Sequence, residues 1–208
     1  MTTDTIPYII YAESTPNPAS MKFVANKILI NEKGASAEYK NITETLTAPI
    51  AKQLFQFPFV KTVFISANYI TVTKVDGVDW DDIILELRNF FTEYLNAGKL
   101  IVTALPKQDV AIDNTFTETK TISTQHEAPQ NEVEAKIVEI LEQYIRPAVE
   151  NDGGLITFKS LVDGVVTVQM RGSCSGCPSS TMTLKAGIEA LLKRLLPDAV
   201  KEVVSEAL

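Results

Sequence analysis

A long polar segment divides the chain and constrains its fold more than any other feature of the sequence. Residues 106–130 are dominated by Lys, Gln, Asp, Asn, Thr, Glu and Ser and show no hydrophobic periodicity. A segment of this composition buries too little apolar surface to order itself, so it is predicted to be a flexible linker. The 208 residues therefore predict two small domains, residues 1–105 and 131–208, joined by that linker.

The first domain is predicted to mix strands and helices. Two runs rich in β-branched residues, separated by a short connection, indicate a hairpin. The clearest helix carries an apolar stripe at helical spacing, and Asp79 precedes it as an N-cap. The predicted strands span residues 8–11, 21–24, 27–30, 60–65 and 69–74, and the predicted helices span residues 48–55 and 80–95.

The second domain is predicted to run in the order helix, strand, strand, cysteine loop, helix, strand. Asp163-Gly164 lies between two β-type runs and indicates a hairpin, and Pro147 is expected to bend or end the last turn of the first helix. These elements are expected at residues 132–150, 155–161, 165–170, 178–196 and 199–204. Both halves thus predict an α/β chain of the α+β type.

Charge and the N-terminus limit the partners and the compartment. The net charge of −7 disfavours the phosphate contacts that bind nucleic acid. The first ten residues contain no Lys or Arg, and Pro7 interrupts their apolar stretch, so they predict neither a secretory signal, nor an Arg-rich transit peptide, nor a membrane span. We therefore expect a cytoplasmic protein that binds neither nucleic acid nor membranes.

Both cysteines of the chain, Cys174 and Cys177, lie in the stretch Arg171-Gly-Ser-Cys-Ser-Gly-Cys-Pro-Ser-Ser180. Pro178 suits the first position of a helix, which places Cys177 near the N-cap and Cys174 about one turn earlier. The positive end of the helix dipole should favour thiolates there, and the small Gly and Ser neighbours should leave both sulfurs open. Thiolates are the ligands that iron–sulfur clusters and zinc select.

Three interpretations of the cysteine pair compete. A lone C-x-x-C in the cytosol can be a thioredoxin-like dithiol, but such a motif is expected early in its domain and this one comes late. Two core cysteines are a poor match to a Gly/Ser loop that opens a helix. Separately from these three, a Cys–His nucleophilic pair is disfavoured because His126, the only histidine, falls in the predicted solvent-facing linker.

The third interpretation is a metal site shared between two chains. A cubane cluster needs four thiolates, and two chains related by a two-fold axis supply them if each gives Cys174 and Cys177. A cluster held in this way between subunits would be suited to transfer. Four sulfurs could equally bind zinc, and the sequence does not separate the two metals.

Several motifs of the second domain go beyond the cysteine pair. They are Asn151-Asp-Gly-Gly154, the hairpin with Gly164 and Val166-x-Val168, Gly172-x-Cys-x-x-Cys-Pro-Ser-Ser180, Thr183-Leu184 and Gly187-Ile-Glu189. Together they resemble the C-terminal domain of NifU, the Nfu-type iron–sulfur scaffold, over about residues 132–204. One departure is Leu155, where many members carry an acidic residue, and we expect it to affect the start of the hairpin more than the cluster.

The first domain resembles the N-terminal domain of many Nfu proteins through Thr15-Pro-Asn-Pro18 and Met21-Lys-Phe23. The resemblance implies a carrier, not an enzyme, that receives a 4Fe–4S cluster from an upstream donor and passes it to apo iron–sulfur clients. It also implies that Cys174 and Cys177 are the ligands and that the cluster-bound form is a homodimer. Recognition of partners is the role usually credited to the N-terminal domain.

Overall fold

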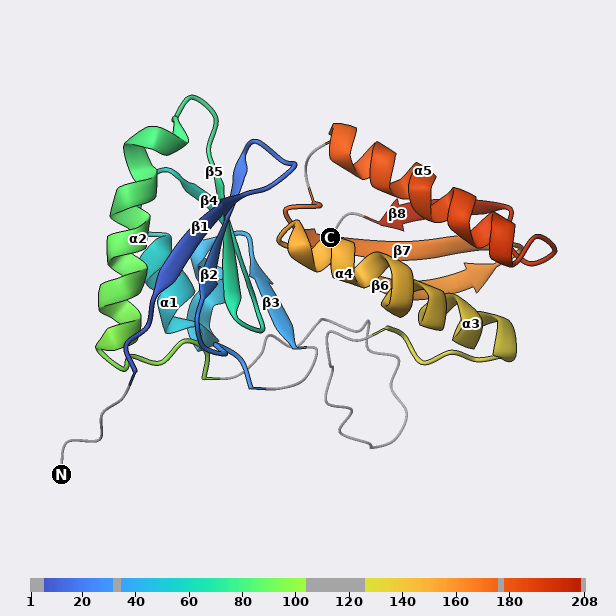
Figure 1. The fold of residues 1–208 in the computed structure, drawn as a ribbon, viewed down its shortest axis with the longest axis horizontal. Coiled ribbons are helices and arrows are strands. Elements are labelled where there is room, and N and C mark those ends of the chain that lie inside the picture. Colours follow the sequence, from blue (N-terminus) through green and yellow to red (C-terminus); the bar gives the residue numbers. More distant parts are fainter. Residues whose placement is uncertain (1–5, 32–34, 104–125, 176–177, 207–208) are drawn as a thin grey trace.

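The computed structural model describes residues 6–31, 35–103, 126–175 and 178–206, without the side chains of residues 178–180. Helices and strands are mixed in two domains, each around its own hydrophobic core (Figure 1). The predicted α+β class is confirmed. Residues 104–125, most of the predicted linker, lie outside the described residues.

The N-terminal domain is built on an antiparallel sheet. Its strands lie in the spatial order β1-β2-β5-β4-β3. Its elements are β1 (Ile10–Ser14), β2 (Ser20–Ala25), β3 (Ser36–Tyr39), the 3₁₀ helix η1 (Ile42–Thr47), α1 (Pro49–Leu54), β4 (Val60–Ser66), β5 (Tyr69–Lys74) and α2 (Trp80–Asn96).

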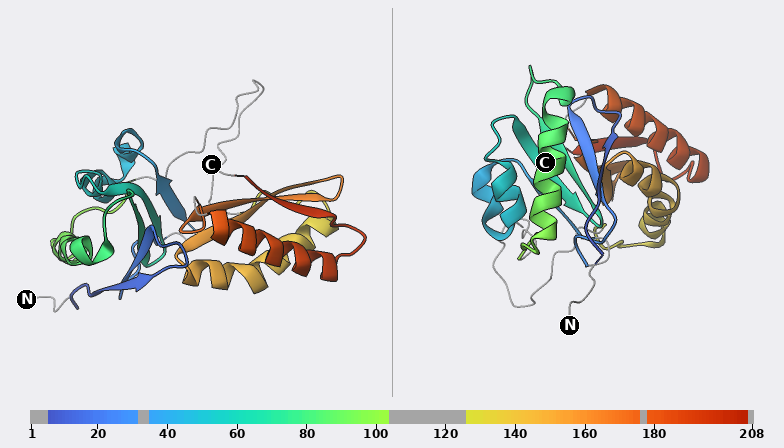
Figure 2. Two further views of the ribbon diagram at one scale, coloured as in Figure 1. Left: turned by 90° about the horizontal axis from the view of Figure 1, so that it is seen from above. Right: turned by 60° about the vertical axis from the view of Figure 1, so that its left-hand side comes forward.

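The two faces of this sheet have different partners. Along β5, Ile70 and Val72 belong to the core that α1 and α2 cover, whereas Tyr69 and Thr71 point the other way. The C-terminal domain lies against that second face, on the side away from α2 (Figures 1 and 2). Because strand side chains alternate, one sheet can contact a core with one face and a neighbouring domain with the other.

The C-terminal domain has a three-stranded sheet in the order β6-β7-β8, with β8 parallel to β7. Its helices lie on one face of that sheet (Figure 2). The predicted order of elements is confirmed: α3 (Glu132–Ile140), the π-helical turn η2 (Leu141–Ile145), α4 (Arg146–Asn151), β6 (Gly154–Val162), β7 (Val165–Gly172), α5 (Pro178–Leu195) and β8 (Glu202–Glu206). Pro147 falls in the first turn of α4, where its missing N–H is tolerated.

One strand prediction is wrong. Residues 27–30 form no strand, and the strand is instead the more polar β3. Leu29 and Ile30 are buried, but their N–H groups bond to the Ala67 carbonyl in a turn, at 2.6 and 3.1 Å, and not to a sheet ladder. An apolar run can thus fill a core without forming a strand.

His126 is not solvent-facing, contrary to the prediction. Its side chain is only 8% exposed, and its Nδ1 accepts a hydrogen bond of 2.7 Å from the Phe158 N–H. Its Nε2 lies 2.5 Å from Glu142 Oε1. Burial lowers the pKa of His126, while the Glu142 carboxylate opposes that shift. The imidazole therefore ties the chain before α3 to β6.

The two N-caps that precede helices α3 and α2 make a matched stability test. The Asn131 side chain accepts a bond of 2.9 Å from the Glu134 N–H, whereas Asp79 makes no such side-chain bond. Asn131→Ala should lower the free energy of unfolding by about 1 kcal/mol, and Asp79→Ala by less, because only the first removes a cap bond. Chemical denaturation measures both, and equal losses would contradict the assignment.

Candidate functional site

The cysteine loop follows β7 at the end of the C-terminal sheet that faces the N-terminal domain (Figure 1). Gly172 ends β7 with φ of 68°, a left-handed conformation that favours glycine. Residues 173–175 continue the loop toward α5. Cys174 is described, whereas Cys177 lies outside the described residues.

A glycine turn between α4 and β6 supports the loop. The Ser173 N–H donates to the Gly153 carbonyl at 3.2 Å, and its hydroxyl donates to the Asp152 carbonyl. A Cβ at Gly154 would lie 2.7 Å from Cys174 Sγ and 2.8 Å from the Arg171 carbonyl oxygen. Only glycine therefore leaves room for the sulfur at this position.

Cys174 is a free thiol and is only 7% exposed. Burial raises its pKa to about 11, the nearby Asp152 carboxylate adds to the rise, and the Ser173 hydroxyl opposes it. The prediction of an open thiolate is therefore wrong for Cys174 in this arrangement. The sulfur packs against the core of the C-terminal domain, and this loss of solvation disfavours the charged form.

A cavity of about 410 Å³ lies beside Cys174. Both domains line it: Pro16 and Asn17 come from the N-terminal turn, and the rest from the C-terminal domain. The C-terminal residues are Asp152, Ser173, Cys174, Thr183 and Leu184. Two residues of the Thr15-Pro-Asn-Pro18 motif, through which the first domain resembles Nfu proteins, therefore lie at the cysteine site.

Two N-terminal side chains bond directly to the cysteine loop. Glu38 Oε1 accepts a 3.0 Å bond from the Gly172 N–H and lies 3.1 Å from the Ser175 hydroxyl. Asn17 Nδ2 donates to the Ser173 carbonyl at 3.0 Å. Asn17 lies in a motif that the sequence shows, but no local pattern signals either contact, because the bonded partners are more than 130 positions away.

The described residues hold no cluster of three or more His, Cys, Asp or Glu side chains that could bind a metal ion. None of the described helices is both long and apolar enough to cross a membrane.

The two halves match two protein families. Residues 10–98 match the family described as the N-terminal domain of the scaffold protein Nfu/NifU, and residues 137–204 match the NifU-like domain.

Three curated relatives resemble the chain over 95% of its length. They are the NFU1 iron–sulfur cluster scaffold homolog, mitochondrial, of Drosophila sechellia, at 36% identity; NifU-like protein 4, mitochondrial, of Arabidopsis thaliana, at 37%; and the human NFU1 iron–sulfur cluster scaffold homolog, mitochondrial, at 32%. The chain spans 66%, 65% and 72% of their respective lengths.

The predicted cytoplasmic location is contradicted, because these relatives are all named mitochondrial. That prediction rested on the charge and hydropathy of the first residues. The charge and hydropathy of those few residues carry no information on the compartment in which the folded domains work.

Gly154 provides a steric test of the loop. Gly154→Ala should lower the free energy of unfolding by about 1–3 kcal/mol, because its methyl group would overlap the Cys174 sulfur and the Arg171 carbonyl. Gly187→Ala, in α5, is the control: a Cβ there has no neighbour within 4 Å, so the change should be neutral or stabilising. Equal effects in a denaturant titration would contradict the close approach.

The raised pKa of Cys174 provides a pH test. In a Cys177→Ser variant Cys174 is the only thiol, and alkylation by iodoacetamide reports its thiolate fraction. The alkylation rate should still rise steeply above about pH 10, where an ordinary thiol approaches its plateau. The denatured variant is the control and should show the ordinary midpoint. A folded-state midpoint at or below the denatured value would contradict burial of the thiol.

Proposed function

The chain belongs to the Nfu/NifU family of scaffold proteins, and from that premise we propose that it carries a 4Fe–4S cluster as cargo. Two copies hold the cluster between them, each through Cys174 and Cys177. The carrier receives the cluster from an upstream donor and releases it to apo iron–sulfur proteins. Its role is that of a scaffold, and it has no turnover of its own.

The number and position of the thiols in one chain support this proposal. Cys174 is free and lies in a loop at one end of its domain, and the chain has one other cysteine. A cubane cluster takes four thiolates, so one chain supplies half a site and a two-fold pair supplies a whole one. The names of the relatives, iron–sulfur cluster scaffold homologs, support the same cargo.

Transfer requires only exchange of ligands. Each client thiolate forms one bond to iron while one thiolate of the carrier leaves and can take up a proton, so no electrons need to move. Once the cargo has left, the thiol is the favoured form of Cys174 in its buried position, where desolvation raises its pKa.

A dithiol oxidoreductase is the main alternative, and two observations count against it. Such enzymes depend on a thiol of lowered pKa, whereas burial raises the pKa of Cys174 to about 11. The cysteine loop also follows both strands of the hairpin, late in its domain, unlike a thioredoxin motif. Rapid reduction of insulin disulfides by the purified protein would favour the oxidoreductase over the cluster carrier.

A zinc-bridged dimer uses the same four sulfurs, so metal content decides between the two ions. Protein purified without oxygen should contain iron and acid-labile sulfide. One zinc ion per two chains, without iron, would show that the shared site holds a structural zinc ion and not a cluster.

Substitution of the ligands tests the proposal. After anaerobic reconstitution with iron and sulfide, the wild-type chain should bind about four irons per two chains and elute as a dimer. Cys174→Ser should lose both the bound iron and the dimer. Val162→Ser, at an exposed site near the hairpin turn, should retain both. A Cys174→Ser variant that keeps its iron would contradict the ligand assignment.

A further inference from the structure

We propose that the N-terminal domain docks on the cysteine loop as a cover, so that docking and cluster binding compete. The docking face comprises Lys22, Glu38, Phe64, Tyr69 and Thr71, on the sheet face away from α1 and α2. The inference rests on the proposed function only for the role of Cys174 as a ligand, and docking itself is testable on the apoprotein.

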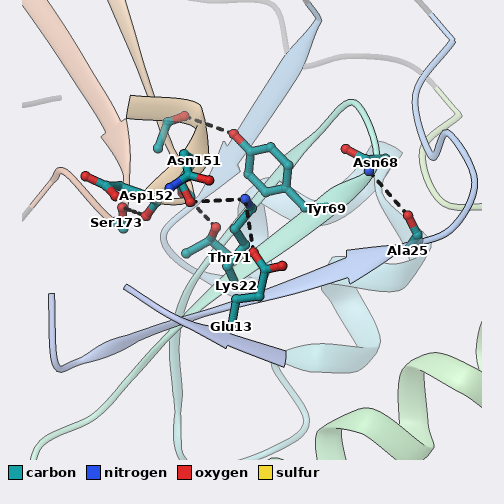
Figure 3. Close-up of polar contacts among 11 residues, drawn as sticks. Glu13, Lys22, Ala25, Asn68, Tyr69, Thr71, Asn151, Asp152 and Ser173 are labelled. Carbon is teal, nitrogen blue, oxygen red and sulfur yellow. Dashed lines mark hydrogen bonds and ion pairs between the residues drawn. The ribbon is translucent and has the colours of Figure 1, made fainter. Parts of the chain in front are cut away.

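Side chains of the docking face donate hydrogen bonds to main-chain carbonyls in and beside the glycine turn. Lys22 Nζ donates to the Asn151 carbonyl at 3.1 Å, Thr71 Oγ1 to the Gly153 carbonyl at 2.7 Å, and the Tyr69 hydroxyl to the Gly154 carbonyl at 2.9 Å. Figure 3 shows the three side chains converging on the turn from β2 and β5. Glu13, 3.4 Å from Lys22 Nζ, holds that ammonium in place.

The N-terminal domain also restrains the cysteine loop. Glu38, on the docking face, accepts from the Gly172 N–H, and Asn17, in the turn between β1 and β2, donates to the Ser173 carbonyl, so the two bonds flank the Gly172–Ser173 peptide just before Cys174. Pro16 and Asn17 also line the cavity beside the sulfur. The N-terminal domain thus contacts the loop immediately before the proposed ligand and closes one side of the space around it.

Glycines on the C-terminal domain permit this close approach. A Cβ at Gly153 would lie 2.9 Å from Thr71 Oγ1, and one at Gly172 would lie 2.9 Å from Phe64 Cδ1. Both glycines also have positive φ, of 79° and 68°. The two domains are therefore in direct contact at the main chain, with no room for a side chain between them.

Leu155 adds an apolar contact to the polar ones. It is 2% exposed and forms a small hydrophobic cluster with Phe64 and Tyr69, separate from both domain cores. The sequence led us to expect that Leu155 would affect the start of the hairpin. In the structure Leu155 lies at the start of β6 and joins that strand to the aromatic pair of the docking face.

The docked N-terminal domain lies where two cysteine loops would have to meet, which is why docking and the shared cluster are proposed to compete. Four thiolates from two chains must converge on one cluster, which brings two cysteine loops together. In the docked form the N-terminal domain lies against that end of the C-terminal sheet and binds residues 172 and 173 (Figure 1). Because each domain has its own core, the contact can open while both domains stay folded.

Labelling of Cys174 in the apoprotein tests docking. In a Cys177→Ser background, Leu155→Asp places a carboxylate against Phe64 and Tyr69, outside the C-terminal core, and should raise the rate of labelling by a maleimide several-fold. Val162→Asp, on the same strand but 62% exposed, is the matched control and should leave the rate unchanged. Equal rates in the two variants would overturn docking as a cover.

A variant on the other domain gives an independent result. Glu38→Gln weakens the bonds to Gly172 and Ser175 and should raise labelling of Cys174 in the same direction, whereas Glu86→Gln, on the exposed face of α2, should not. Circular dichroism checks that each variant remains folded. A folded Glu38→Gln variant that labels like Glu86→Gln would contradict the docking contact.

Iron uptake tests the competition itself. With both cysteines present, Leu155→Asp should take up iron from iron and sulfide faster than Val162→Asp, with the same final iron content. Faster labelling without faster uptake would overturn the competition while leaving docking in place. If no variant and no wild-type protein binds iron, the proposed function fails, and the labelling result still reports on docking.

Discussion

The packing of Cys174 against Gly154 is the contact on which the site depends. A sulfur can lie over this position only because glycine leaves the space free, and a Cβ there would come within 2.7 Å of it. The same turn supplies the carbonyls that bind Ser173 on one side and the N-terminal sheet on the other. One short segment, Asn151-Asp-Gly-Gly154, thus fixes the position of the cysteine loop and joins the two domains.

The chemistry of the thiol follows from that packing. The helix start and the small neighbours predict an activated thiolate, whereas the structure buries the sulfur and raises its pKa to about 11. Each hydrogen bond from a side chain of the N-terminal domain to the main chain of the C-terminal domain contributes roughly 1 kcal/mol. A few such bonds are enough to favour the docked form of the apoprotein. The four bonds from thiolates to iron can outweigh them when a cluster binds. In this proposal the cysteine loop has two states: docked, with Cys174 as a buried thiol, and undocked, with Cys174 as a thiolate ligand of the cluster.

The sequence predicts local structure well where a local rule applies. Asp163-Gly164 identifies the hairpin of β6 and β7, and the apolar stripe after Asp79 identifies α2. Periodicity fails at residues 27–30, where an apolar run fills the core without a sheet partner. The cysteine pair is visible in the sequence, but Asn17 and Glu38 are not, because their roles arise only when the second domain packs against the first. Leu155 is intermediate: its unusual identity is visible, and its contact with Phe64 is not.

Lysine footprinting reports whether cluster binding releases the N-terminal domain from the cysteine loop. Lys22 Nζ is held against the Asn151 carbonyl with its side chain 10% exposed, whereas Lys61 in the same sheet is exposed. Acetylation followed by mass spectrometry compares the two lysines in the apoprotein and in the iron-loaded dimer. Acetylation of Lys22 relative to Lys61 should rise several-fold on loading, to the level of apo Leu155→Asp. If Lys22 in the loaded dimer stays as protected as in the apoprotein, the N-terminal domain remains docked and does not compete with the cluster.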